Sequence, residues 1–144
     1  MTKRVSVECR CAQFIVTSYT EVTWGMWYMN GHFEFIPLDA GPVALGQAVL
    51  DALDAANQVV PPDVKPPIAP VLRALRLRSY GQYMRGARSV GVEIDDDGVV
   101  RLTPRRNDGP KAGFTPLTDR ASVLDDRSPE AMTIAVKEAI EAAE

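Results

Sequence analysis

The chain has 144 residues and a mass of 15.7 kDa, and it is 46% hydrophobic and 24% charged. This length corresponds to one domain, and the composition excludes wholesale disorder and a fibrous protein. We therefore expect a single domain over residues 1–144 that builds its own hydrophobic core.

The sequence predicts a cytoplasmic protein. No apolar run approaches the ~20 residues that a helix needs to cross a bilayer. The first eight residues carry two basic side chains but no continuous apolar stretch, so we expect no secretory signal. The chain has two cysteines, which is too few for a disulfide framework.

The formal net charge of −3 is distributed in three blocks. Residues 1–64 hold 3 Lys/Arg against 7 Asp/Glu, residues 65–111 hold 10 against 5, and residues 112–144 hold 3 against 7. The basic middle block either binds an acidic partner or balances the acidic ends within the folded molecule. We favour charge balance within the folded molecule, because it needs no ligand.

The first 36 residues read as strands. Apolar and polar residues alternate over 5–11 and again over 22–28, and residues 14–17 are β-favouring. The pair Asn30-Gly31 predicts a hairpin turn, followed by a return strand over 32–36.

A helix is predicted over 42–57, because apolar side chains recur there at helical spacing. A proline-rich stretch follows and predicts a stiff connector. Its prolines are Pro61, Pro62, Pro66, Pro67 and Pro70. Short helices are predicted over 71–77 and 79–85, the second capped by Ser79 and ended by Gly86.

Residues 89–94 and 99–103 predict a second hairpin. A three-residue turn, Asp96 to Gly98, places Ile94 opposite Val100 and keeps the apolar face intact, with Gly98 left-handed. Residues 104–119 read as a long loop because Pro and Gly interrupt them repeatedly. Residues 121–124 predict a last strand.

The motif Ser128-Pro129-Glu130 opens a terminal helix to about residue 143, with Thr133 on its outer face. Alternating strands joined by short turns favour antiparallel pairing. The sequence therefore predicts an α+β fold, with a mostly antiparallel sheet against which helices 42–57 and 129–143 pack.

No catalytic or metal-binding motif is present. His32 is the only histidine and is expected to be an exposed strand residue beside Glu34. Cys9 and Cys11 share a strand face and are expected to be buried free thiols. The acidic run around Asp95 resembles part of a calcium loop, but Pro104 stands where the last ligand is required. We therefore expect no enzyme, no catalytic residue, no metal and no cofactor.

One segment offers an alternative function. Arginines alternate with tyrosines over 73–88, and single-stranded nucleic acid is held by this combination of charges and stacking rings. The residues are Arg73, Arg76, Arg78, Tyr80, Tyr83, Arg85 and Arg88. Helices also carry surface arginines and bury tyrosines, so a nucleic-acid-binding or regulatory module is the second interpretation.

Several blocks occur in a familiar order. They are Ile36-Pro37-Leu38-Asp39, Ala44 to Leu50, Arg78-Ser79-Tyr80, Met84 to Ala87, and Ser128-Pro129-Glu130. Over about residues 36–144 this order is similar to immunity proteins of contact-dependent growth inhibition systems. The resemblance implies a small cytoplasmic α+β protein that binds and neutralises the C-terminal toxin domain, often a nuclease, of a large surface-exposed effector. Toxin-contacting residues differ within that family, so none is carried over.

Charge suggests where a nuclease toxin would bind. Nucleases need basic surfaces to hold a polyanion, so their inhibitors tend to present carboxylates. Two groups of aspartates lie outside the positions that we expect to be buried, one on the helix over 42–57 and one at the tip of the second hairpin. An exposed Trp27 would add an apolar anchor. The predicted contact residues are Asp51, Asp54, Asp95, Asp96, Asp97 and Trp27.

Overall fold

The computed structural model describes residues 1–23, 25–58, 63 and 65–144. The elements in chain order are β1 (Lys3–Arg10), β2 (Gln13–Thr23), β3 (Met26–Pro37), α1 (Ala44–Ala55), α2 (Ala69–Ala74), α3 (Tyr80–Met84), β4 (Arg88–Ile94), β5 (Val100–Asn107), β6 (Phe114–Pro116), the 3-10 turn η1 (Thr118–Arg120), β7 (Ser122–Leu124) and α4 (Pro129–Ala142).

In the described part of the chain, seven strands form one sheet in which each pair is antiparallel. The strand order is β3-β2-β1-β4-β5-β6, and β7 also pairs with β5. The N-terminal strand β1 therefore lies inside the sheet, between β2 and β4. This arrangement confirms the predicted α+β class.

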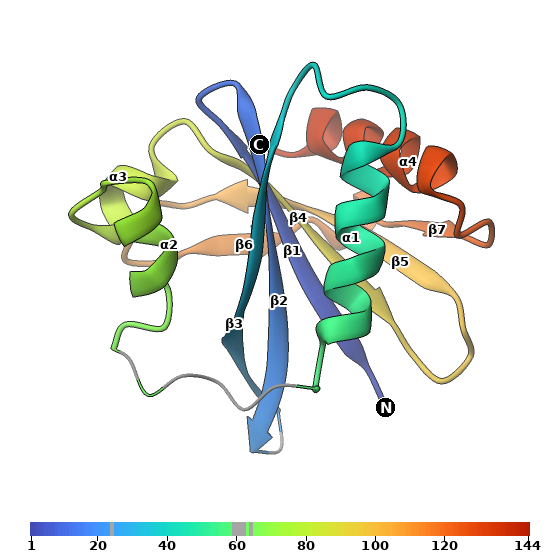
Figure 1. Ribbon diagram of the computed structural model, residues 1–144, viewed down its shortest axis with the longest axis horizontal. Helices are drawn as coiled ribbons and strands as arrows, with labels where there is room; N and C mark the ends of the chain where they lie inside the picture. Colours follow the sequence, from blue (N-terminus) through green and yellow to red (C-terminus); the bar gives the residue numbers. More distant parts are fainter. Residues whose placement is uncertain (24, 59–62, 64) are drawn as a thin grey trace.

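The sheet is covered on both faces, by different helices (Figure 1). Val5 and Val7 of β1 pack with α1 and α4 in the larger core. Ser6 and Glu8, which alternate with them, point to the opposite face, where α2 and α3 pack on Ile15 in a smaller core. Both faces of β1 are therefore buried.

The predicted turn at Asn30-Gly31 is wrong, because β3 runs unbroken through both residues. The chain instead reverses between Thr23 and Met26, which are paired. Asn30 and Gly31 form a bulge at which the register shifts, with Gly31 at a φ of 92°. The Asn30 amide donates to the Ser18 hydroxyl at 3.1 Å and to a carbonyl of α1 at 3.2 Å. An Asn-Gly pair can form a bulge as well as a turn, and here the hydrogen bonds that Asn30 makes to distant residues favour the bulge.

The predicted helices form, with shifted ends. Helix α1 begins at Ala44 and ends at Ala55, two residues inside each predicted end. Helix α2 begins at Ala69 and holds Pro70 in its first turn, so Pro70 opens a helix rather than extending the connector. The Ser79 hydroxyl accepts the Gln82 amide at 3.2 Å, as the predicted cap of α3. Pro61 and Pro62 lie outside the described residues.

The β4–β5 hairpin confirms the predicted register. Ile94 pairs with Val100, Val92 pairs with Leu102, and Gly98 has a φ of 76°. The predicted loop over 104–119 is wrong in part, because β5 continues to Asn107 and pairs with the short strand β6.

Helix α4 is capped as predicted, since the Ser128 hydroxyl accepts the Ala131 amide at 3.2 Å. Thr133 is not on its outer face: it is buried against α1. The error arises because α4 packs on both the sheet and α1, which makes its buried face wider than the apolar stripe.

Candidate partner-binding surfaces

The structure brings most of the predicted acidic residues together. Asp54 on α1 and Asp95 and Asp96 at the β4–β5 tip line one hollow of about 290 Å³. Asp51 lies one turn before Asp54 on α1 and accepts a bond from Gln47 at 2.9 Å. We call this region the acidic hollow.

Cations of the same chain already occupy the acidic tip. Arg101 pairs with Asp95 at 3.3 Å and with Asp97 at 3.1 Å. The N-terminal amino group pairs with Asp96. The Val99 amide, followed by Arg101, lowers the pKa of Asp97. Lys3 and Arg127 also line the hollow, so its charge is largely balanced within the protein.

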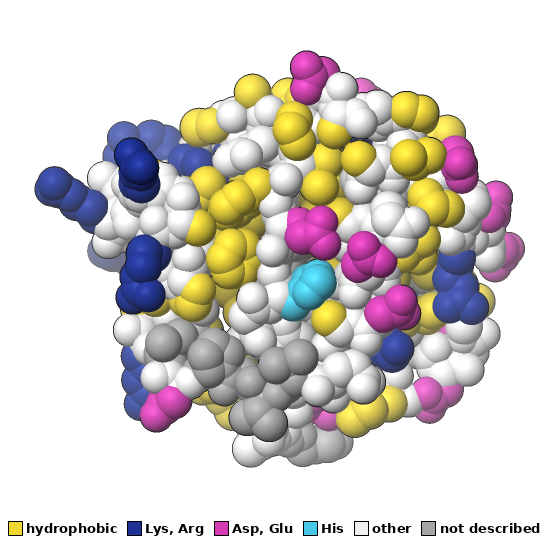
Figure 2. All heavy atoms as spheres, in the orientation of Figure 1, with side chains coloured by type: hydrophobic (Ala, Val, Ile, Leu, Met, Phe, Trp, Pro, Cys, Tyr) yellow, Lys and Arg dark blue, Asp and Glu magenta, His cyan; other side chains and the backbone are white. Residues whose placement is uncertain are grey.

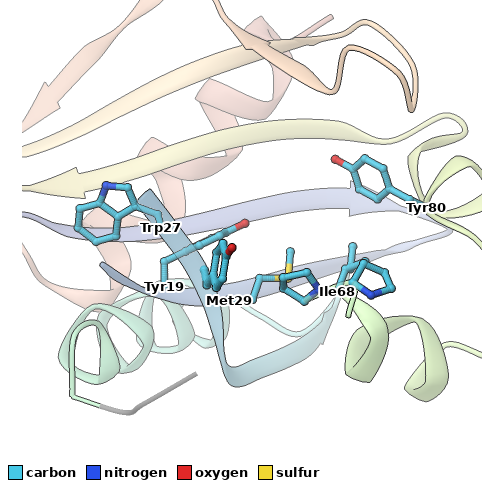
Figure 3. Close-up of a pocket in the computed structure, with 8 residues that line it drawn as sticks. Tyr19, Trp27, Met29, Ile68 and Tyr80 are labelled. Atoms are coloured by element: carbon cyan, nitrogen blue, oxygen red, sulfur yellow. The ribbon is translucent and has the colours of Figure 1, made fainter. Parts of the chain in front are cut away.

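Trp27 does not join the acidic residues. It lines a pocket of about 300 Å³ between β2–β3 and the segment that leads into α2. Figure 3 shows the rings of Tyr19 and Trp27 on one side of this pocket and Tyr80 across from them. Arg4 lies over the Trp27 ring, 4.8 Å from its centre. Trp24, the other tryptophan of the chain, lies outside the described residues.

We call this hollow the aromatic pocket. Its lining includes Tyr19, Trp27, Tyr28, Met29, Ile68 and Tyr80. Tyr28 is 41% exposed, so part of the lining is in contact with solvent. A mostly apolar hollow with a few hydroxyl groups is the usual form of a binding pocket.

A buried polar network lies on the same face of the sheet. Glu8, 2% exposed, accepts bonds from the hydroxyls of Ser6 at 2.6 Å, Ser89 at 2.8 Å and Tyr83 at 2.8 Å. Arg105 donates to Ser6 at 2.9 Å, and its guanidinium lies where a side chain on Gly91 would be. The carboxylate is thus fully hydrogen-bonded, as a buried charge must be.

This network reaches the aromatic pocket through tyrosines. Burial, and then the charge of Glu8, raise the pKa of Tyr19, Tyr80 and Tyr83, while Arg105 lowers that of Tyr19 and Tyr80. The sequence alone does not show this network, because the alternation over 5–11 is typical of a strand whose polar face, here with Ser6 and Glu8, is exposed to solvent. Only the position of β1 between β2 and β4, under α3, shows that this face is buried.

The basic segment forms a coherent surface. Arg73, Arg76, Arg78 and Arg85 are all exposed on α2, α3 and their flanking residues. Figure 2 shows Lys and Arg gathered over this side of the molecule, with hydrophobic side chains next to them. Among the described residues, no carboxylate lies within ion-pair distance of these four arginines. We call them the arginine surface.

The remaining candidates offer little chemistry. Cys11 is exposed in the β1–β2 turn at a φ of 47° and Cys9 is half-buried, so the expected pair of buried thiols is wrong. Burial raises the pKa of Cys9. His32 is half-exposed beside Glu34, at 3.7 Å. In the described ranges, no group of three His, Cys, Asp or Glu side chains is placed to hold a metal.

Two solved structures share this fold along the whole chain. One is a protein of unknown function, NMB0488, from Neisseria meningitidis, with 16% identity, a TM-score of 0.79, and coverage of 100% of this chain and 96% of that one. The other is a chain of the CdiA-CT/CdiI toxin and immunity complex from Yersinia pseudotuberculosis, with 14% identity, a TM-score of 0.78, and coverage of 100% and 98%.

No family model matches the sequence, and no curated protein matches it. At these identities the two structures establish a shared fold. Among the described residues, no helix combines the length and the apolar character that a bilayer crossing requires.

Proposed function

We propose that this chain is an immunity protein of a contact-dependent growth inhibition system. It acts in the cytoplasm by binding the C-terminal toxin domain of a large surface-exposed effector, and it inhibits by binding rather than by catalysis. The observation that carries the proposal is the match to a chain of a toxin and immunity complex, which extends over 100% of this chain and 98% of the other. The block order from residue 36 onward supports it independently.

The first experiment separates an immunity protein from a toxin. The chain is expressed alone in a sensitive bacterium, and growth is followed. We expect normal growth, because an inhibitor has no target in the absence of its toxin. Growth arrest would instead place this chain on the toxin side of such a pair.

The second experiment tests neutralisation. On this proposal the gene for this chain follows an effector gene, and the probe is the toxin domain encoded at the 3′ end of that effector gene. Co-expression of this chain should restore growth, and the two purified proteins should form a stable complex. Neutralising complexes are typically nanomolar or tighter, near −12 kcal/mol of binding free energy. Absence of both protection and complex formation would refute the proposal.

The arginine surface supports a second candidate function, which is that of a nucleic-acid-binding module. Its four arginines, which have no carboxylate partner among the described residues, are suited to phosphates. The stacking partners are weaker, because Tyr83 is 1% exposed and Tyr80 is half-buried. Binding to single-stranded RNA or DNA oligonucleotides, measured by fluorescence anisotropy, should be undetectable at physiological salt. Strong, salt-sensitive binding would favour this second function.

A further inference from the structure

The aromatic pocket and the arginine surface lie next to each other. A second hollow, of about 350 Å³, is lined by Leu72, Arg73, Leu77 and Arg78. Both hollows share Tyr80 and Pro66 in their lining. The two hollows therefore lie side by side, with Tyr80 and Pro66 bordering both, and we call them together the docking groove, with an aromatic end and an arginine end.

The aromatic end presents rigid rings to solvent. Tyr28 is 41% exposed, and Trp27 and Tyr80 are half-buried. Aromatic residues that line a hollow and remain partly exposed are the residue types on which binding energy concentrates in protein interfaces. The occupant of this end is accordingly a large apolar or aromatic side chain.

The arginine end specifies the charge of the occupant. Arg73 and Arg78 line the groove, and among the described residues no carboxylate pairs with them. By contrast, Arg101 and the N-terminal amino group already balance the acidic tip. An unbalanced guanidinium pair at the edge of an apolar groove is complementary to carboxylates, which it binds in bidentate geometry.

We propose that the docking groove binds a segment of the toxin domain that carries an apolar or aromatic side chain next to acidic residues. This inference rests on the proposed function and names the surface and the chemistry through which it is performed. It places the interface on the α2–α3 side of the sheet and not at the acidic hollow. Trp27 then contributes as an aromatic neighbour of Tyr19.

A nucleic acid fits the groove less well. Its phosphates would satisfy the arginines, but its bases need exposed stacking faces at that end. Helix α3, which follows Arg78, offers Tyr80, which is half-buried, and Tyr83, which is 1% exposed and stacked on Tyr80 with centroids 6.2 Å apart. The groove therefore favours an acidic polypeptide.

The first test measures the affinity for the upstream-encoded toxin domain by calorimetry. The double variant Arg73→Glu/Arg78→Glu and the single variant Tyr28→Ala should each weaken binding about tenfold or more. Lys137→Glu and Val123→Ala, exposed residues of α4 and β7, are the matched controls and should change it less than about twofold. Circular dichroism melting confirms that each variant is folded.

Two results are decisive in that experiment. If both groove variants bind like the wild type while Asp51→Lys/Asp54→Lys loses affinity, the groove is not the interface and the acidic hollow is. If the wild type does not bind the toxin domain, the proposed function fails. The peptide experiment described next then tests the binding chemistry of the groove by itself.

The second test uses the acetylated, amidated tripeptide Phe-Glu-Glu and follows amide chemical shifts by NMR. Saturable shifts should appear at Tyr28, Arg78 and Tyr80, and Arg73→Glu/Arg78→Glu should abolish them. The analogues Ala-Glu-Glu and Phe-Gln-Gln, which lack the ring or the charges, should bind at least about fivefold more weakly. The proposal is overturned if Phe-Glu-Glu causes no shifts there, if Phe-Gln-Gln binds equally well, or if an oligouridylate displaces it.

Discussion

The backbone amide of Gly46, in the first turn of α1, donates a hydrogen bond of 2.8 Å to the hydroxyl of Thr133 in α4. The same hydroxyl donates onward to the Pro129 carbonyl at 2.8 Å. Helix α1 has no side-chain cap of its own, so a residue of α4 satisfies one of its free amides. The two helices on this face of the sheet are thus joined by a polar bond as well as by apolar packing.

Thr133→Val should destabilise the protein by about 1–3 kcal/mol, because it keeps the shape but leaves the buried Gly46 amide without an acceptor. Thr133→Ser keeps the hydroxyl and should cost less. The midpoints of urea unfolding provide the measurement. Equal losses for the two variants would show that the methyl group, and not the hydrogen bond, matters at this position.

Gly46→Ala should also destabilise the protein, although alanine is usually the better residue inside a helix. An added Cβ would lie 1.9 Å from the Pro129 carbonyl oxygen and 2.8 Å from the Thr133 hydroxyl. The helices must then move apart, at a cost of about 1–3 kcal/mol.

The control for this substitution is Gly98→Ala in the β4–β5 turn. That Cβ would meet no atom within 4 Å, so only the positive φ of 76° opposes it, at about 1 kcal/mol. Thermal melting should rank Gly98→Ala as the milder change. The reverse order would contradict the close approach of α1 and α4.

Glu8→Ala should cost about 3 kcal/mol or more, because Ser6, Ser89 and Tyr83 lose their shared acceptor in a buried site. Glu8→Gln keeps one acceptor oxygen and should cost less. Glu93→Ala is the matched control: Glu93 pairs with Arg4 at 2.6 Å but is about one-third exposed (35%). Its loss should be at most about 1 kcal/mol in chemical denaturation. Similar values for Glu8→Ala and Glu93→Ala would mean that the network is open to water.

Stability should decline in alkaline solution. Burial and Glu8 raise the pKa of Tyr19, Tyr80 and Tyr83 above the ordinary value of 10.0. A group whose pKa is raised on folding stabilises the fold below its unfolded pKa, and this contribution is lost as pH rises through the folded value. Urea midpoints should therefore fall from about pH 10 upward.

Tyr83→Phe supplies the control for this pH dependence. The variant loses the bond to Glu8 and should be less stable at neutral pH, but its stability should fall less steeply in alkali because one buried ionising group is gone. An identical slope in the variant and the wild type would assign the alkaline loss to other groups.

Local patterns predicted much of the fold. The β4–β5 register follows from keeping Ile94 and Val92 on one face, and the caps at Ser79 and Ser128 follow from the adjacent sequence. These features depend on residues close in the chain, and for that reason the α+β class and the two main helices were predictable. The acidic residues at the β4–β5 tip were placed at an exposed turn for the same reason.

The features that define the candidate surfaces depend on residues far apart in the chain. Asn30-Gly31 forms a bulge rather than a turn because Asn30 bonds to Ser18 and to α1. Glu8 is buried because β4 pairs with β1 across about 80 residues of sequence, which places β1 inside the sheet, and because α2 and α3 cover the face on which Glu8 lies.

The sequence by itself determined the α+β class, the two main helices, the caps at Ser79 and Ser128, and the separation of charge into acidic ends and a basic middle. Tertiary structure alone decided which side chains meet. Within the described part of the chain, Arg73 and Arg78 have no carboxylate partner, the tip aspartates pair with cations of the same chain, and Trp27 lies on the opposite face from Asp54. The physical reason is that charge balance and burial depend on the distances between strands and helices. The hydrophobic periodicity of a single segment does not contain that information.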